Sequence, residues 1–225
     1  MTNTQNTPWA TNETKLHSAS EALGLSLSDD QVIKLLAYLA LIQKWNKVYN
    51  LTAIRDPAEM LTHHLLDSLA IVAPLIRQTK GASISMLDVG AGAGLPGVVV
   101  AICCPQIKVT CVDAVAKKMA FVQQVATELR LTNLKALHAR VETLNVKYDV
   151  ISSRAFATLL DFVTGSQAAL KPDTGIWLAM KAKDTSAEVA DLPKDVAVFH
   201  VEQLIVPGLD AERCIVWMKH TEDFK

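Results

Sequence analysis

The sequence has no long apolar run, and this absence argues against a membrane protein. Among its 225 residues, no apolar stretch reaches the roughly 18 residues that a transmembrane helix needs. The amino terminus begins with polar residues and lacks the basic start and apolar run of a signal peptide. We therefore expect a cytoplasmic protein, in which the Asn50-Leu51-Thr52 sequon is not a glycosylation site.

Cysteine is scarce, and its spacing argues against a zinc-binding or redox motif. The four cysteines form no CxxC pair and stand in apolar surroundings. Buried thiols in a reducing compartment are the simplest interpretation of that placement. We therefore expect neither a disulfide framework nor a metal site.

Charge of neither sign is in excess. The 22 Lys and Arg residues nearly balance the 23 Asp and Glu residues, which gives a formal net charge of -1. Residues 81–154 are locally basic, with eight basic against five acidic side chains, whereas residues 155–225 carry seven against eleven. A globally basic nucleic-acid-binding protein is excluded, so an RNA or DNA ligand would need a local patch of Lys and Arg.

The first 80 residues predict a helical amino-terminal extension. We expect disorder to about residue 13, followed by a short helix over 14–23. Ser28 is a candidate N-cap with Gln31 as its capping-box partner, and Asp56-Pro57 predicts another helix that runs to about residue 73. At this chain length, one domain with an appendage is expected rather than two domains.

From residue 81 to residue 225 the pattern changes to strands that alternate with helices. Predicted strands cover 84–89, 108–112, 134–138, 148–152 and 175–180, with a final pair at 196–204 and 213–219. The alternation predicts an α/β, Rossmann-like fold with a mainly parallel, seven-stranded sheet. The final pair leaves little room for a crossover helix, so we expect an antiparallel hairpin at the sheet edge. We expect this core and the extension over 1–80 to form one structural unit.

The stretch over 87–97, LDVGAGAGLPG, is the strongest functional signal. Glycines directly after a strand and before a helix let the backbone approach a ligand closely and expose its amide groups. Two registers fit this stretch. Residues 92–97 match the dinucleotide fingerprint GxGxxG, and residues 88–94 match DxGxGxG, the loop of S-adenosylmethionine-dependent enzymes.

Charge favours the S-adenosylmethionine register. A dinucleotide brings an anionic pyrophosphate to this loop, where the carboxylate of Asp88 would be unfavourable. S-adenosylmethionine instead brings a cationic ammonium and sulfonium, whose charge the carboxylate of Asp88 would stabilise. Gly92 has no side chain to keep the ligand away from the backbone. We expect Asp113, at the end of the second strand, to accept hydrogen bonds from ribose hydroxyls. Glu142, after the third strand, is expected to contact adenine or ribose.

The end of the fourth predicted strand is where acceptor chemistry is usually found in such enzymes, and it reads YDVISSRAF over 148–156. It has neither the Asn-Pro-Pro-Tyr motif that holds an exocyclic base amine nor a Pro-Cys nucleophile for pyrimidine C5. Arg154 remains, whose guanidinium can bind a carboxylate or stack on a base. The alternative is a surface or salt-bridging arginine.

Five motifs occur in order along the chain. They are Asn50-Leu51-Thr52, His64-Leu65-Leu66-Asp67-Ser68, the Asp88–Gly97 loop, Arg140-Val141-Glu142 and Ser153-Arg154-Ala155-Phe156. With this set the sequence closely resembles the bacterial 16S rRNA guanine-N7 methyltransferase G family, formerly called glucose-inhibited division protein B. The resemblance covers about residues 25–219. Ala93 stands where we expect proline in many relatives, a small departure that leaves the expected cofactor unchanged.

The resemblance implies an enzyme that uses S-adenosylmethionine to methylate N7 of one guanosine in 16S rRNA, with the 30S ribosomal subunit as its partner. It also implies a set of cofactor contacts. These contacts are Gly90, Leu95, Val141, Glu142 and Arg154. We expect a monomer that has no membrane partner and no metal.

Guanine N7 is a lone pair that carries no proton, so its attack on a sulfonium methyl needs no general base. We therefore expect catalysis by alignment and exclusion of water, with Arg154 positioning the cofactor or the base. His64 and Asp67, one helical turn apart, are expected to satisfy each other in a structural role. Roles for His63 at the active site and for Lys181 toward phosphate stay open.

Three other hypotheses stay open on the residues alone. The acceptor could be a small molecule or a protein, which the near-neutral charge permits. A nicotinamide-dependent oxidoreductase fits the overlapping glycine register, and a non-catalytic interaction protein could retain the same fold. Binding of S-adenosylmethionine rather than NAD would exclude the oxidoreductase, and methyl transfer to rRNA would separate the others.

Overall fold

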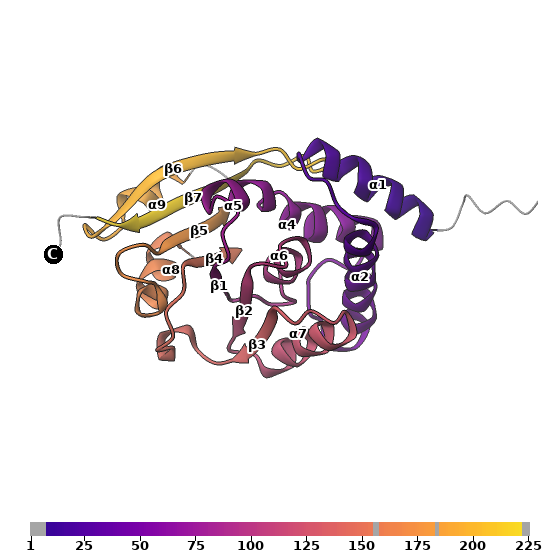
Figure 1. Cartoon of the computed structure of the whole chain (residues 1–225), viewed down its shortest axis with the longest axis horizontal. Coiled ribbons are helices and arrows are strands. Elements are labelled where there is room, and N and C mark those ends of the chain that lie inside the picture. Colours follow the sequence, from indigo (N-terminus) through magenta and orange to yellow (C-terminus); the bar gives the residue numbers. More distant parts are fainter. Residues whose placement is uncertain (1–7, 155–157, 183–184, 222–225) are drawn as a thin grey trace, which may run out of the picture.

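The computed structural model describes residues 8–154, 158–182 and 185–221, and a seven-stranded sheet forms its centre (Figure 1). The strands are β1 (Ser85–Val89), β2 (Lys108–Asp113), β3 (Leu134–His138), β4 (Val150–Arg154), β5 (Ile176–Lys181), β6 (Val196–Leu204) and β7 (Arg213–His220). Their order in the sheet is β3-β2-β1-β4-β5-β7-β6.

Helices surround this sheet. They are α1 (Pro8–Ala22), α2 (Asp29–Tyr49), α3 (Pro57–Met60), α4 (Asp67–Leu69), α5 (Val72–Gln78), α6 (Gly97–Cys103), α7 (Ala116–Glu128), α8 (Leu159–Ser166) and α9 (Ser186–Ala190). A π-helical turn (Leu61–Leu66) joins α3 to α4, and 3₁₀ turns cover Val141–Thr143 and Gln167–Ala169. Within the described residues, none of these helices is long and apolar enough to span a membrane.

Strands β1 to β5 are parallel, whereas β7 is antiparallel to both of its neighbours. The predicted α/β fold and the terminal antiparallel hairpin are therefore confirmed. The hairpin enters the sheet through its second strand, so β7 lies beside β5 and β6 forms the edge. This arrangement brings the start of β7 to the carboxyl end of β5, at the same edge as the ends of β1 and β4.

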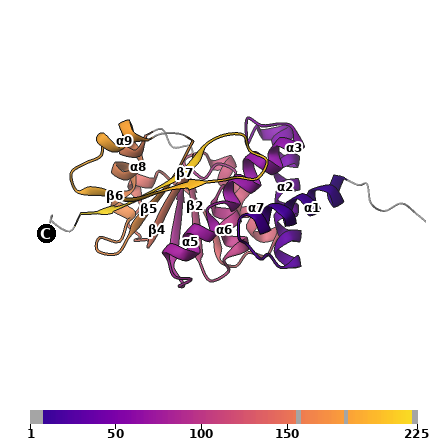
Figure 2. The same ribbon diagram turned by 90° about the horizontal axis from the view of Figure 1, so that it is seen from above.

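Alternation along the strands divides the core into two layers. In β1, Met86 packs in one apolar cluster and Leu87 in the other, and Val150 and Ile151 of β4 divide in the same way. The first cluster contains side chains of α6, α7 and the amino-terminal helices, and the second contains those of α8. Figure 2 shows α8 and α9 on one side of the sheet and α2, α6 and α7 on the other.

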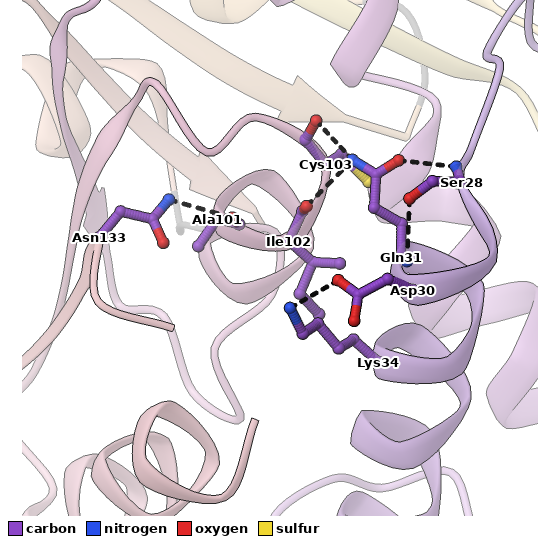
Figure 3. Close-up of polar contacts among 8 residues, drawn as sticks. All are labelled: Ser28, Asp30, Gln31, Lys34, Ala101, Ile102, Cys103 and Asn133. Carbon is purple, nitrogen blue, oxygen red and sulfur yellow. Dashed lines mark hydrogen bonds and ion pairs between the residues drawn. The ribbon is translucent and has the colours of Figure 1, made fainter. Parts of the chain in front are cut away.

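The amino-terminal helices share the apolar cluster of the core. Helix α2 begins with Ser28 as N-cap and Gln31 closing the capping box, as predicted. The Gln31 amide also donates to the carbonyl oxygens of Ile102 (3.2 Å) and Cys103 (3.0 Å), at the end of α6 (Figure 3). Carbonyls at a helix end lack partners within the helix, so Gln31 fixes α6 to the extension. A domain boundary near residue 80 stays a proposal.

Two expectations for the extension are wrong in detail. Helix α1 begins at Pro8, so disorder to residue 13 does not hold for residues 8–13; residues 1–7 lie outside the described part of the chain. The helix that begins at Pro57 does not continue regularly to residue 73, because the π-helical turn interrupts it and α5 begins separately at Val72. Apolar spacing cannot distinguish these arrangements, since residues 64–72 are all buried and show no single apolar face.

Candidate functional site

The glycine loop lies between β1 and α6, and Asp88 holds it from behind. One oxygen of the Asp88 carboxylate accepts from the Gly97 amide at 2.9 Å, and the other accepts from the Ser152 hydroxyl at 2.9 Å. Burial is complete and raises the pKa of Asp88 to about 6, against the opposing effect of these hydrogen bonds. A Cβ on Gly97 would lie 2.5 Å from the Cys111 sulfur, so only glycine allows this close packing.

The front of the loop is held by Asp113 and Tyr38. The Asp113 carboxylate accepts from the backbone amides of Gly92 (3.0 Å) and Val115 (2.8 Å). The Tyr38 hydroxyl, on α2, donates to the Ala93 carbonyl at 2.7 Å. Side chains from β2 and from the extension therefore fix the loop conformation before any ligand binds.

Two cavities adjoin at the carboxyl edge of the sheet, near β1 and β4, where the order of the strands in the sheet reverses. The larger has a volume of about 580 Å³, within the range of about 300–1,000 Å³ typical of small-molecule sites. Of the predicted site residues, Gly90, Gly92, Leu95 and Arg154 line it. The smaller, about 210 Å³, is lined by Gly90, Asp113, Val141 and Glu142.

Gly90 lines both cavities, so the structure brings seven of the eight predicted site residues together around two adjoining cavities. Asp88 is the exception among the described residues, since it lines neither cavity and both its oxygens are bonded by the protein. Its direct contact with a cofactor cation stays a prediction. In the motif Ser153-Arg154-Ala155-Phe156, the last two residues lie outside the described part of the chain.

Asp67 joins two arginines at the wall of the larger cavity. Its carboxylate accepts from Arg154 Nη1 at 3.0 Å and from Arg213 Nε at 2.9 Å. The expected pairing of His64 with Asp67 is wrong, because His64 Nε2 lies 3.0 Å from the Thr52 hydroxyl instead. Arg154 is a salt-bridging arginine and also lines the cavity, so the two alternatives for it are not exclusive.

His63 and His64 lie on the π-helical turn, and both line the larger cavity. The His63 carbonyl accepts a hydrogen bond from Arg154 Nη1 at 2.9 Å. Burial, and then the nearby Arg154 guanidinium, lower the pKa of His64 to about 4. His64 is therefore neutral near pH 7, and within the described structure its Nδ1 atom is buried without a hydrogen-bond partner.

Lys181 lies at the end of β5 and also lines the larger cavity. Its ammonium group is 2.7 Å from Glu188, which in turn accepts from the Leu159 amide at 2.7 Å. A contact of Lys181 with phosphate stays a prediction. Among the described residues, no group of three or more His, Cys, Asp or Glu side chains is placed to hold a metal ion.

The chemistry of the two cavities fits S-adenosylmethionine. Asp113 and Glu142 place acceptors in the smaller cavity, where hydroxyl and amine donors of an adenosine would lie. The larger cavity offers the guanidinium of Arg154 for a carboxylate, beside the open backbone of the glycine loop. The cations that line the larger cavity, Arg154, Lys181 and Arg213, are each paired with a carboxylate of the protein.

Comparison with known proteins decides between the remaining hypotheses. Residues 31–216 match the family model described as rRNA small subunit methyltransferase G. The chain belongs to this family. The resemblance seen in the sequence is thereby confirmed, the protein is an enzyme, and the oxidoreductase and non-catalytic hypotheses are set aside.

Individual relatives agree with this assignment. The chain is 61% identical over 219 residues to the Ribosomal RNA small subunit methyltransferase G of Albidiferax ferrireducens, which covers 93% of this chain and 97% of that protein. The protein of the same name from Paracidovorax citrulli is 61% identical over 215 residues, with 91% of this chain and 88% of that protein covered.

Solved structures support the fold alone. TrmN from Thermus thermophilus superimposes with a TM-score of 0.56 at 18% identity, covering 72% of this chain and 53% of that chain. The ribosomal protein L11 methylase of Lactobacillus delbrueckii subsp. bulgaricus gives a TM-score of 0.53 at 12% identity, over 68% and 78% of the two chains. The Rossmann-like methyltransferase fold is therefore confirmed.

Sequence reasoning missed the contributions of Tyr38 and Arg213 to this site. Tyr38 falls on the apolar face of α2, where spacing predicts a core residue. Arg213 begins a predicted strand and stands in no motif, and its place depends on β7 entering the sheet beside β5. No local signal could have identified either residue.

Proposed function

We propose that this chain transfers a methyl group from S-adenosylmethionine to N7 of one guanosine in the 16S rRNA of the small ribosomal subunit. The observation that carries the proposal is the pair of adjoining cavities, which meet at Gly90 and are lined by the family's motifs. We further propose that the enzyme acts as a monomer in the cytoplasm, with the 30S subunit as its partner.

The smaller cavity is proposed to hold the adenosine and the larger cavity the methionine group and the target base. When bound, S-adenosylmethionine supplies an electrophilic methyl group on a sulfonium centre. Asp113 and Glu142 accept hydrogen bonds from the nucleoside, and the Leu95 and Val141 side chains give apolar contact. Arg154 binds the carboxylate of the methionine group, held in place by Asp67.

The proposed reaction needs no proton acceptor, and the ionisable groups of the larger cavity agree with that. Its two described carboxylates, Asp67 and Glu188, are each paired with cations. His64 is unprotonated at neutral pH and is not needed to deprotonate N7, which carries no proton. The residues act by binding, orientation and exclusion of water, which are sufficient for an in-line transfer to a lone pair.

The experiment that tests this function is transfer of labelled methyl from S-adenosylmethionine to 30S subunits prepared from cells that lack the enzyme, followed by mapping of the label. Label at N7 of a single guanosine is the expected result. Label at another atom, or on a co-purifying small molecule or protein, would overturn the assigned acceptor. Free 16S rRNA in a parallel reaction distinguishes the naked RNA from the assembled particle as substrate.

A further inference from the structure

Arg213 stands out among the cavity residues because it belongs to none of the family's motifs and has a defined geometry. It comes from β7, 146 residues after its partner Asp67. Its Nε donates to Asp67 at 2.9 Å, and its Nη1 donates to the Glu212 carbonyl at 2.9 Å. In the described part of the chain, no residue accepts a hydrogen bond from Nη2. The Nε and Nη1 atoms therefore fix the orientation of the guanidinium, and Nη2 is left to bind a ligand.

The sheet places Arg213 outward from the cofactor loop. Arg154 of β4 pairs in register with Met180 of β5, and Lys181 pairs with Cys214 of β7, so Arg213 follows directly at the cavity edge. Because β4 and β7 are two strands apart, their backbones are separated by about 10 Å. Arg154 lies close enough to the loop for its charge to lower the pKa of Asp88.

The charges at this wall do not cancel. Asp67 is one carboxylate between two guanidinium groups, and it is buried with 4% of its surface exposed. Lys181 is neutralised by Glu188. One positive charge therefore remains at Arg154 and Arg213 together, and both side chains are 20% exposed. If Arg154 binds the cofactor carboxylate, the remaining positive charge lies at Arg213 and is available to the substrate that accepts the methyl group.

We propose that Arg213 binds a backbone phosphate of the rRNA next to the target guanosine, and that Asp67 positions both arginines, one for the cofactor and one for the RNA. The inference rests on the proposed function. A guanidinium fixed through Nε keeps its other donors in one plane, which suits the oxygens of a phosphate. The bidentate contact that arginine usually makes to guanine would occupy N7, the atom that takes the methyl group, which favours a phosphate as the partner of Arg213.

The test is Arg213→Gln, assayed for binding of unmethylated 30S subunits by filtration and for binding of S-adenosylmethionine by calorimetry. The dissociation constant for the subunits should rise about tenfold, as for loss of one charge-assisted hydrogen bond. The dissociation constant for the cofactor should change by less than about twofold. The slope of log affinity against log salt concentration should fall by about one unit, because one phosphate contact is lost.

Arg77→Gln is the matched control. Arg77, at the end of α5, is exposed, pairs with Glu202 of β6 and lines neither cavity. The same chemical change there should leave both dissociation constants and the salt slope unaltered. Arg213→Lys keeps the positive charge but loses the planar set of donors of the guanidinium. It should therefore retain the salt slope, with a smaller loss of affinity for subunits than Arg213→Gln. It also serves as the second variant if Arg213→Gln folds poorly.

Three results would overturn the inference. An unchanged affinity for subunits with Arg213→Gln would show that Arg213 does not contact the RNA. An equal loss of cofactor and subunit binding would show that it supports Arg154 alone. Equal effects of Arg213→Gln and Arg77→Gln on subunit binding would show that the loss comes from the change in net charge and not from a contact of Arg213. The proposed function fails separately, when the wild-type enzyme labels no guanosine N7 although it binds the subunit.

Discussion

The hydroxyl of Tyr38 donates a hydrogen bond of 2.7 Å to the carbonyl oxygen of Ala93 across 55 residues of sequence. Both residues are buried, and the tyrosine ring stacks on Phe121. This bond from the amino-terminal helices therefore holds the glycine loop together with the bonds of Asp88 and Asp113. The extension belongs to the cofactor site through this contact.

Replacing Tyr38 by phenylalanine should weaken binding of S-adenosylmethionine about fivefold, which corresponds to loss of one hydrogen bond. The ring and its packing stay, while the buried Ala93 carbonyl loses its donor and the loop gains freedom. Calorimetry measures the dissociation constant. Tyr49→Phe, at the exposed end of α2, is the matched control and should bind normally. A lower melting temperature with unchanged affinity would show that Tyr38 only packs.

Asp88→Asn should change how stability depends on pH. The folded-state pKa of Asp88 is raised from 3.8 to about 6, so the folded protein holds this proton more tightly than the unfolded chain. The stability that this proton contributes is present below pH 4 and is lost as pH rises through 6. The difference in unfolding free energy, variant minus wild type, should therefore rise by about 2 kcal/mol from pH 4 to 7.

Denaturant titrations between pH 4 and 7 measure that difference. Asparagine can accept from the Gly97 amide and donate to the Ser152 hydroxyl, so the fold should be retained. Asp191→Asn, which makes the same chemical change at an exposed carboxylate, is the matched control. A flat difference for Asp88→Asn would show that its pKa is not raised.

His64→Gln should change the pH dependence in the opposite direction. The pKa of His64 is lowered from 6.5 to about 4, so the unfolded chain binds this proton more tightly than the folded protein. The stability contributed is complete above pH 6.5 and is lost as pH falls toward 4. The difference in unfolding free energy, variant minus wild type, should therefore fall as pH rises through this window. In the wild type, the effects of Asp88 and His64 on stability thus change with pH in opposite directions.

The same titrations test this expectation, with exposed His200→Gln as the control. In the proposed mechanism no imidazole accepts a proton. The rate of methyl transfer with His64→Gln should accordingly keep the wild-type dependence on pH above 6.5, even where its magnitude falls. A transition near neutral pH that disappears with this variant would contradict the mechanism.

Glu142→Gln should raise the dissociation constant for S-adenosylmethionine about tenfold, because a charged acceptor in the smaller cavity becomes a weaker neutral one. Binding of 30S subunits should stay within about twofold of wild type, since the contact is proposed to be with the nucleoside of the cofactor. Glu128→Gln, exposed on α7, is the control. A loss of subunit binding without a loss of cofactor binding would place Glu142 on the acceptor side.

Much of the fold follows from local pattern in the sequence. The Ser28–Gln31 capping box and the boundaries of β3 and β6 agree with prediction, because each depends on neighbouring residues and on regular spacing. The π-helical turn could not be predicted, since the residues around it are buried on all sides and show no helical period. The role of Asp88 within the glycine loop could not be predicted either, because only its burial shows that it faces the protein.

The sequence by itself determined the family, the Rossmann-like sheet and most of the residues around the two cavities, because these are carried by motifs that short-range geometry brings to one sheet edge. Only the tertiary structure decided the partners of Asp67. It joins Arg154 from β4 and Arg213 from β7, and it does not pair with His64 one turn away. The physical reason is that β7 enters the sheet between β5 and β6, and pairing between strands so distant in sequence leaves no local signal.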